Sequence, residues 1–189
     1  MLAPILASAC ANRTTLPELK VSAALPAYPN TDDGLRTLIR DLLDAQGTAI
    51  DLQRRMHSSI IPNSSAWFIN EFGPTTGPIL DLQYRGQLAA QFSRLYRHLP
   101  HYAAAQNRFI SVEHSASGQL SPFVTDSPLI PLATQPLRLY SAGVSYVDDG
   151  LSMKVGTFVY VDGNFRYLGW LEANPSSETL RSYDEPFEY

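Results

Sequence analysis

Glu113 and His114 are consecutive residues whose side chains can donate and accept protons. They lie in residues 107–115, where polar and apolar residues alternate, which predicts a strand. Neighbours on a strand point to opposite faces, so either residue would work with a helix side chain such as Tyr84 or Arg85. A carboxylate or an imidazole in an apolar cavity has a shifted pKa and can perform general acid–base catalysis. The alternative, a polar strand face that meets water, is the commoner arrangement.

Aromatic side chains form a second candidate site. Together they predict a pocket for a small apolar or aromatic ligand. The alternative is that they form the ordinary core, where aromatic residues bury most of their surface. The set consists of Trp67, Tyr84, Tyr140, Phe158, Tyr160 and Trp170.

Motifs for other chemistry are absent from the sequence. It contains no phosphate-binding glycine loop, no Gly-x-Ser-x-Gly elbow and no His-Glu-x-x-His helix. His98 and His101 are spaced as metal ligands can be, but no adjacent acidic residue joins them, which favours an ordinary place at a helix end. Cys10 is the single cysteine, which excludes an internal disulfide. We predict no metal site and no cofactor.

Length, composition and charge narrow the class of protein. A chain of 189 residues with 44% hydrophobic residues is long and apolar enough for one domain with a real core. Its 14 basic and 18 acidic residues give a net charge of −4. A mildly acidic chain without a basic stripe is a poor candidate for binding phosphate backbones, so nucleic acid is not predicted as a partner.

The N-terminal residues have features of an export signal. Residues 1–10 hold a short apolar stretch, small residues at Ala7 and Ala9, and then Cys10, which resembles a bacterial lipobox. The pattern departs from a lipobox, in which the leucine usually lies three residues before the cysteine. In this sequence that position is Ala7, and the leucine is Leu6. We predict an exported protein of the periplasm or cell envelope, attached to a membrane only if Cys10 is lipidated. The alternative is an apolar end with an incidental thiol.

The segments that flank the domain have distinctive compositions. Residues 11–32 contain three prolines and little periodicity, which predicts an extended linker. Residues 173–189 form an acidic tail, for which a solvated segment is the default. Its aromatic residues offer the alternative of docking on the domain or on a partner; they are Tyr183, Phe187 and Tyr189.

Helices are predicted between residues 33 and 100. Residues 31–33 supply capping oxygens, and a helix starts near Gly34 with apolar residues at helical spacing. A second helix is predicted over residues 48–57, a short aromatic one over residues 66–73, and a longer one from Thr76 that Pro100 ends. The apolar stripe of the first helix is Leu35, Leu38, Ile39, Leu42 and Leu43.

Strands are predicted in the C-terminal half, over residues 107–115, 137–147, 152–161 and 164–171. Asp162-Gly163 between the last two is a strong hairpin signal, because both turn residues need a positive φ. Helices followed by strands predict an α+β fold, with N-terminal helices packed on a curved antiparallel sheet of about four strands. The domain spans residues 33–172. Both faces of the last hairpin are apolar, so one packs on helices while the other lines a cavity or meets a partner.

This order of elements resembles the NTF2-like (SnoaL-like) superfamily, whose helices lie across a strongly curved antiparallel sheet. The resemblance covers residues 33–172 and rests on element order. It departs from the family because no strand is predicted before Asn107. The ending, residues 158–169, is similar to that of uncharacterised exported bacterial proteins, a likeness that implies export and fold.

Two functions remain open. The first is a non-catalytic binding or interaction module of the bacterial cell envelope, whose partner is a small apolar or aromatic ligand, another protein or a second copy of this chain. The second is a small NTF2-like enzyme, an isomerase, lyase or hydrolase with acid–base groups in an apolar pocket. A pocket with Glu113 or His114 beside Tyr84 would favour the enzyme. A filled core with an exposed aromatic sheet face would favour the module.

Overall fold

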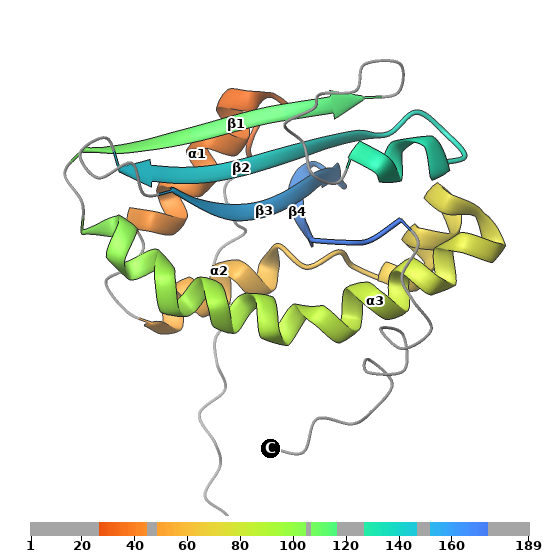
Figure 1. The fold of residues 1–189 in the computed structure, drawn as a ribbon, viewed down its shortest axis with the longest axis horizontal. Helices are drawn as coiled ribbons and strands as arrows, with labels where there is room; N and C mark the ends of the chain where they lie inside the picture. The colour runs from red at the N-terminus through yellow and green to blue at the C-terminus, as the bar shows by residue number, and fades with distance from the viewer. Residues whose placement is uncertain (1–26, 45–48, 105–106, 117–126, 147–151, 174–189) are drawn as a thin grey trace, which may run out of the picture.

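Three helices precede a four-stranded antiparallel sheet in the computed structural model, which describes residues 27–44, 49–104, 107–116, 127–146 and 152–173. The strand order is β1-β2-β3-β4 and the sheet is not closed. The predicted α+β fold is therefore confirmed. Figure 1 shows α1 behind the sheet, with α2 and α3 below it. The elements are α1 Asp32–Asp44, α2 Ala49–Ser58, α3 Ser64–Ala103, β1 Arg108–Ala116, a 3₁₀ helix η1 Ser127–Leu132, β2 Arg138–Tyr146, β3 Ser152–Val161 and β4 Asn164–Gly169.

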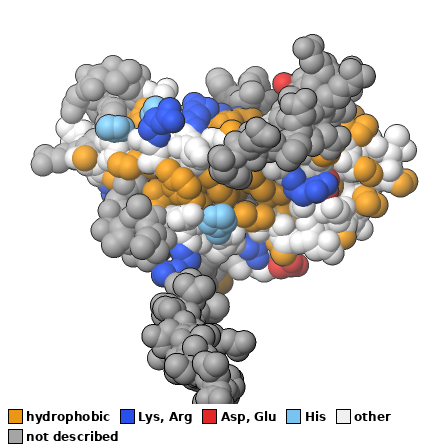
Figure 2. Space-filling model, turned by 90° about the horizontal axis from the view of Figure 1, so that it is seen from below, with side chains coloured by type: hydrophobic (Ala, Val, Ile, Leu, Met, Phe, Trp, Pro, Cys, Tyr) orange, Lys and Arg blue, Asp and Glu red, His pale blue; other side chains and the backbone are white. Residues whose placement is uncertain are grey.

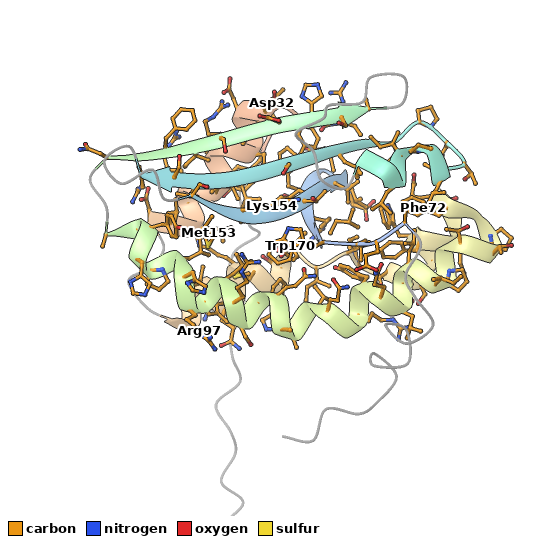
Figure 3. The ribbon with its side chains drawn as sticks, in the orientation of Figure 1. Asp32, Phe72, Arg97, Met153, Lys154 and Trp170 are labelled. Atoms are coloured by element: carbon orange, nitrogen blue, oxygen red, sulfur yellow. The ribbon has the colours of Figure 1, made fainter. Side chains whose placement is uncertain are left out.

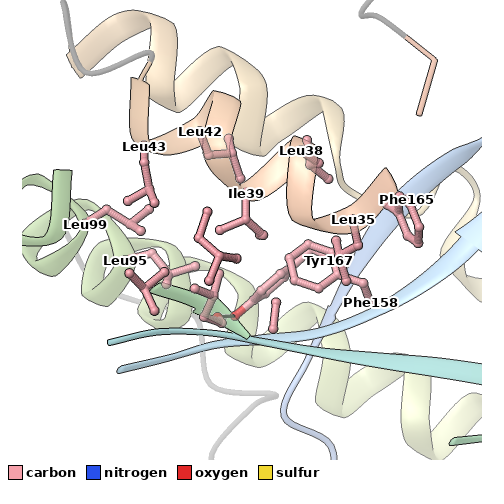
Figure 4. Packing of buried hydrophobic residues seen from close by; sticks show 14 of the residues in the cluster. Leu35, Leu38, Ile39, Leu42, Leu43, Leu95, Leu99, Phe158, Phe165 and Tyr167 are labelled. Carbon is pink, nitrogen blue, oxygen red and sulfur yellow. Dashed lines mark hydrogen bonds between the residues drawn. The ribbon is translucent and has the colours of Figure 1, made fainter. Parts of the chain in front are cut away.

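Helix α1 packs through the apolar stripe that the sequence predicts. All five stripe residues are buried, and Figure 4 shows several of them against Phe158 and Tyr167 of the sheet. Thr31 caps the N-terminal end of this helix, because its Oγ1 accepts a hydrogen bond of 3.1 Å from the Gly34 N–H. Tyr28 lies in the segment expected as a linker, is 7% exposed, and accepts a bond of 2.8 Å at its carbonyl from the Tyr160 hydroxyl.

Helix α3 consists of two helical parts that meet at Gly73, as the sequence predicts. Gly73 has φ 78° and ψ 172°, a conformation that glycine adopts without strain. At the other end the prediction that Pro100 closes the helix is wrong, since the helix runs to Ala103. Proline removes a donor but keeps its carbonyl, and the Ala104 N–H donates to Pro100 O at 3.2 Å.

The sheet separates two clusters of buried side chains. The first lies on the face toward α1 and α2, here called the inner face, and holds Tyr140 and Tyr167 together with Phe92 from the C-terminal part of α3. The second lies on the opposite face, the outer face, and holds Leu139 and Phe68 from the N-terminal part of α3. Helix α3 therefore passes beside β4 and contributes to both faces.

Two irregularities in strand pairing curve the sheet. The register between β2 and β3 shifts at Ala142/Gly143, and that between β3 and β4 shifts at Thr157/Phe158. Such bulges bend a strand and increase its twist. The hairpin between β3 and β4 turns at Asp162 and Gly163, with φ 50° and 76°, as predicted from their types. In the part of the chain that the structure describes, no helix is long and apolar enough to cross a membrane.

Candidate functional site

The outer face of the sheet is divided into two halves with different surroundings. In the first, the covered half, Leu139, Val159 and Leu168 are at most 4% exposed. Their cover is the N-terminal part of α3 together with η1 and the residues that follow it. This half is a second core. The covering side chains are Phe68, Phe72, Leu80, Tyr84, Leu129, Ile130 and Leu137.

The second half, the open half, holds a depression of about 230 Å³ near the β1 side of the sheet. Polar side chains share its lining with Ala142, Gly143 and Met153, and Figure 3 shows where Met153 and Lys154 leave β3. Phe109 follows the same alternation on β1 and is 59% exposed, so an apolar ring stands near the polar depression. The polar lining residues are Ser111, Glu113, Ser141, Ser152 and Lys154.

Strand alternation explains why these residues share one face. On β1, Ile110 and Val112 are buried on the inner face, so Ser111 and Glu113 point outward. Across the ladder Ser111 is paired with Gly143 and Glu113 with Ser141, which places serine and glycine beside the carboxylate. Gly143 leaves space in the depression, because a Cβ at this position would lie 2.9 Å from the Ser111 Oγ.

The charge of the depression comes from an exposed carboxylate and a less accessible ammonium. Within the described residues Glu113 is exposed and makes no hydrogen bond or ion pair. The Lys154 Nζ is buried, and Lys154 has an interaction of its own within the protein. Serine hydroxyls can donate or accept around Glu113. This arrangement can bind a positively charged or hydroxyl-bearing group.

The four residues considered for acid–base work are separated from one another in their surroundings. His114 is on the side opposite Glu113, with its Nδ1 2.8 Å from Asp32 Oδ1 and its ring 5.8 Å from that of Tyr140. Tyr84 lies in the second core, where its hydroxyl accepts a 3.0 Å bond from the Ile61 N–H. Burial raises the pKa of Tyr84 to about 12. Arg85, on α3, is paired with a carboxylate of its own helix.

The six aromatic residues are likewise distributed between separate environments. Tyr140 and Phe158, each 1% exposed, pack in the first cluster with Tyr160 at its margin. Trp67 packs beside the second cluster, to which Tyr84 belongs. Trp170 lies against α3, with the Arg94 guanidinium 4.6 Å from its ring centre. None of the six lines the depression.

A buried carboxylate in α3 was not foreseen from the sequence. Asp81 is 2% exposed and accepts hydrogen bonds from Ser64 Oγ (2.6 Å), Ser65 Oγ (2.5 Å) and Arg85 Nε (3.0 Å). Because Ser64 and Ser65 begin the first part of α3, Asp81 joins its two parts. No local signal marks this role, since the partners are 16 and 17 residues away. The serines of the open half could be placed from the sequence, because side chains alternate between the two faces along β1 and β2.

Comparison with protein-family models, with curated proteins and with solved structures finds no match for this chain. The helices packed on a four-stranded antiparallel sheet are compatible with an NTF2-like fold. Among the residues placed by the structure, no three His, Cys, Asp or Glu side chains are grouped so as to hold a metal ion. Cys10 lies outside the described residues.

Proposed function

We propose that the protein is a non-catalytic binding module that contacts a partner protein through the open half of its outer sheet face. The main support is the depression in this half. Within the described residues its Glu113 carboxylate has no partner, and the exposed ring of Phe109 lies on the same strand. A partner that offers a basic side chain beside an apolar one is complementary to this pair.

The size of the depression supports a protein partner over an enclosed ligand. Ligand pockets typically measure about 300–1,000 Å³, whereas this depression has about 230 Å³ and is open. It therefore suits one side chain of a larger partner. A pocket with Glu113 or His114 beside Tyr84 would have favoured the enzyme alternative, and the separate locations of these residues support the binding module instead.

We also propose a superfamily and a cellular location for this protein. The fold supports membership of the NTF2-like superfamily, with the helices laid across a curved antiparallel sheet. Residues 1–10 support export to the periplasm or cell envelope. Cell fractionation followed by mass spectrometry of the N-terminal peptide tests export, because a processed end in the envelope fraction is expected. An unprocessed chain confined to the cytoplasm would contradict it.

The binding site is tested with two small probes that share an aliphatic stem. N-acetyl-lysine methylamide carries a charge, and N-acetyl-norleucine methylamide does not. We expect the lysine probe to bind with a dissociation constant in the millimolar range, about −4 kcal/mol, since it makes one ion pair and a small apolar contact. Amide chemical shifts measured during a titration give the affinity.

Matched variants locate the binding. Glu113→Gln is expected to reduce binding of the lysine probe by up to about fivefold, because an exposed ion pair contributes up to about 1 kcal/mol. Glu172→Gln removes another exposed acidic residue, beyond β4, and is expected to bind as the wild type does. Equal affinity for both probes, or equal loss in both variants, would contradict the proposal.

A further inference from the structure

Helices α2 and α3 carry five of the 14 Lys and Arg residues of the chain, and few acidic residues lie beside them. From Gln83 to its end α3 contains no acidic residue, and Asp51 is the single one in α2. Arg97 and His98 on α3 are exposed, and so are Arg54 and His57 on α2. Figure 3 shows Arg97 on the part of α3 that faces away from the sheet. We call this surface the basic helix face.

An apolar band accompanies these charges. Figure 2, seen from the side where α2 and α3 lie, shows a continuous apolar band bordered by Arg and His side chains. The two helices meet through a contact between the rings of His57 and Phe92, 5.9 Å apart. Phe92 is only 4% exposed, so the apolar surface here comes from partly buried neighbours such as Leu88 and Tyr96. Apolar surface edged by positive charge suits a partner that is both acidic and aromatic.

The C-terminal residues of the same chain have this chemistry. Residues 172–189 contain five acidic residues and one arginine, so they hold the whole net charge of −4. Aromatic residues are interspersed with the acidic ones, at Tyr183, Phe187 and Tyr189. This composition complements both the charge and the apolar band of the basic helix face.

The point of attachment brings the tail within reach. Trp170 stacks on Arg94 and the Glu172 N–H donates to Gln83 Oε1 at 3.1 Å, so the described chain ends beside α3 after running toward the N-terminal end of that helix. To reach Arg97 the tail must turn back along α3. From Gln83 to Arg97 the helix rises about 21 Å. About ten extended residues span about 33 Å, so Tyr183 and the residues after it can reach Arg97. A tethered segment also has a high effective concentration at such a surface.

We propose that residues 174–189 dock on the basic helix face within the same molecule, with carboxylates against Arg97 and its neighbours and aromatic rings on the apolar band. The tail thereby covers a surface separate from the open half of the sheet. This interaction is independent of the proposed function, because it involves neither the depression nor Phe109.

The test uses the full chain and a zero-length cross-link. Arg97→Lys keeps the charge and supplies an amine, which a carbodiimide joins to a neighbouring carboxylate. We expect a cross-link within one molecule between position 97 and Glu178, Asp184, Glu185 or Glu188, identified by peptide mass spectrometry. Its yield falls as salt is raised, because ions screen exposed charges over about 8 Å at 0.15 M.

Two controls make the result decisive. Arg40→Lys places the same amine on an exposed site of α1, behind the sheet, and is expected to give at most about a tenth of the yield. Serine in place of Tyr183, Phe187 and Tyr189 in the Arg97→Lys chain is expected to lower the yield several-fold. Equal yields from positions 97 and 40, or a yield unchanged by the serines, would overturn the proposal.

A membrane is the competing occupant of the same face. Flotation of the full chain with vesicles of phosphatidylcholine and phosphatidylglycerol measures this directly. We expect no binding to the vesicles, since the tail occupies the face. Binding that is lost on Arg97→Glu and kept on Arg40→Glu would assign the face to an anionic lipid surface and overturn the proposal.

Discussion

The two halves of the outer sheet face use the same strands for different purposes. On β2, Leu139 is fully buried under α3 and η1, whereas Ser141, two residues further along on the same face, lines an open depression. Alternation alone assigns both residues to one face. What separates them is whether another element covers the face at that point. Burial makes the first half part of the core, and exposure leaves the second half available for binding.

We expect the largest effect on the free energy of unfolding when Leu139 and Ser141 are each replaced and the two variants are compared. Leu139→Ala is expected to lower the free energy of unfolding by about 3 kcal/mol, because it removes buried methyl groups and leaves a cavity. Ser141→Ala is expected to change it by less than about 0.5 kcal/mol. Urea unfolding of the two variants measures both values. Similar losses in the two would contradict the division of the face.

A smaller effect is expected where α3 is held over the covered half. Asp81→Ala leaves Ser64 and Ser65 without their acceptor and is expected to cost about 2 kcal/mol. Asp81→Asn keeps one acceptor oxygen and is expected to recover part of this loss. Urea unfolding at neutral pH distinguishes them. An Asp81→Ala variant as stable as the wild type would show that this carboxylate does not hold the two parts of α3 together.

The pH dependence at alkaline pH reports on the second core. Burial raises the pKa of Tyr84 to about 12, above its ordinary value of 10.0. The neutral phenol is thus favoured by folding, and its contribution to stability is complete below pH 10 and is lost as the pH rises through 12. Tyr84→Phe is expected to cost about 1 kcal/mol at pH 7, since the Ile61 N–H loses its acceptor.

The same variant is expected to flatten the decline of stability between pH 10 and 12. Thermal unfolding across this range measures the slope. The burial of Tyr28 and its bond of 2.7 Å to Asp41 also raise the pKa of that residue, so part of the slope remains. A slope identical to that of the wild type would show that Tyr84 is not buried as a neutral phenol.

Local patterns predicted the elements well and their assembly in part. The five apolar residues of α1 follow helical spacing without interruption. The residue types of Asp162 and Gly163 predict the turn between β3 and β4. The break at Gly73 was also visible. Each of these features is decided by interactions within a few residues.

The site depended on contacts that no local pattern encodes. Phe68 and Phe72 cover Leu139 and Val159 from about 70–90 positions away in the chain, and this cover decides which part of the outer face stays open. Strand alternation placed Glu113 and His114 on opposite faces, yet could not say that Glu113 is the one left exposed in a depression. Asp81 was missed for the same reason.

One substitution tests the central claim, that the open half binds and the covered half stabilises. Ser141→Phe fills the depression without reaching the covered half. We expect an unfolding free energy within about 0.5 kcal/mol of the wild type and a loss of binding to N-acetyl-lysine methylamide. Both are measured on one sample by urea unfolding and by amide chemical shifts. A variant that unfolds easily, or that still binds the probe as the wild type does, would contradict the division of the outer face into a binding half and a stabilising half.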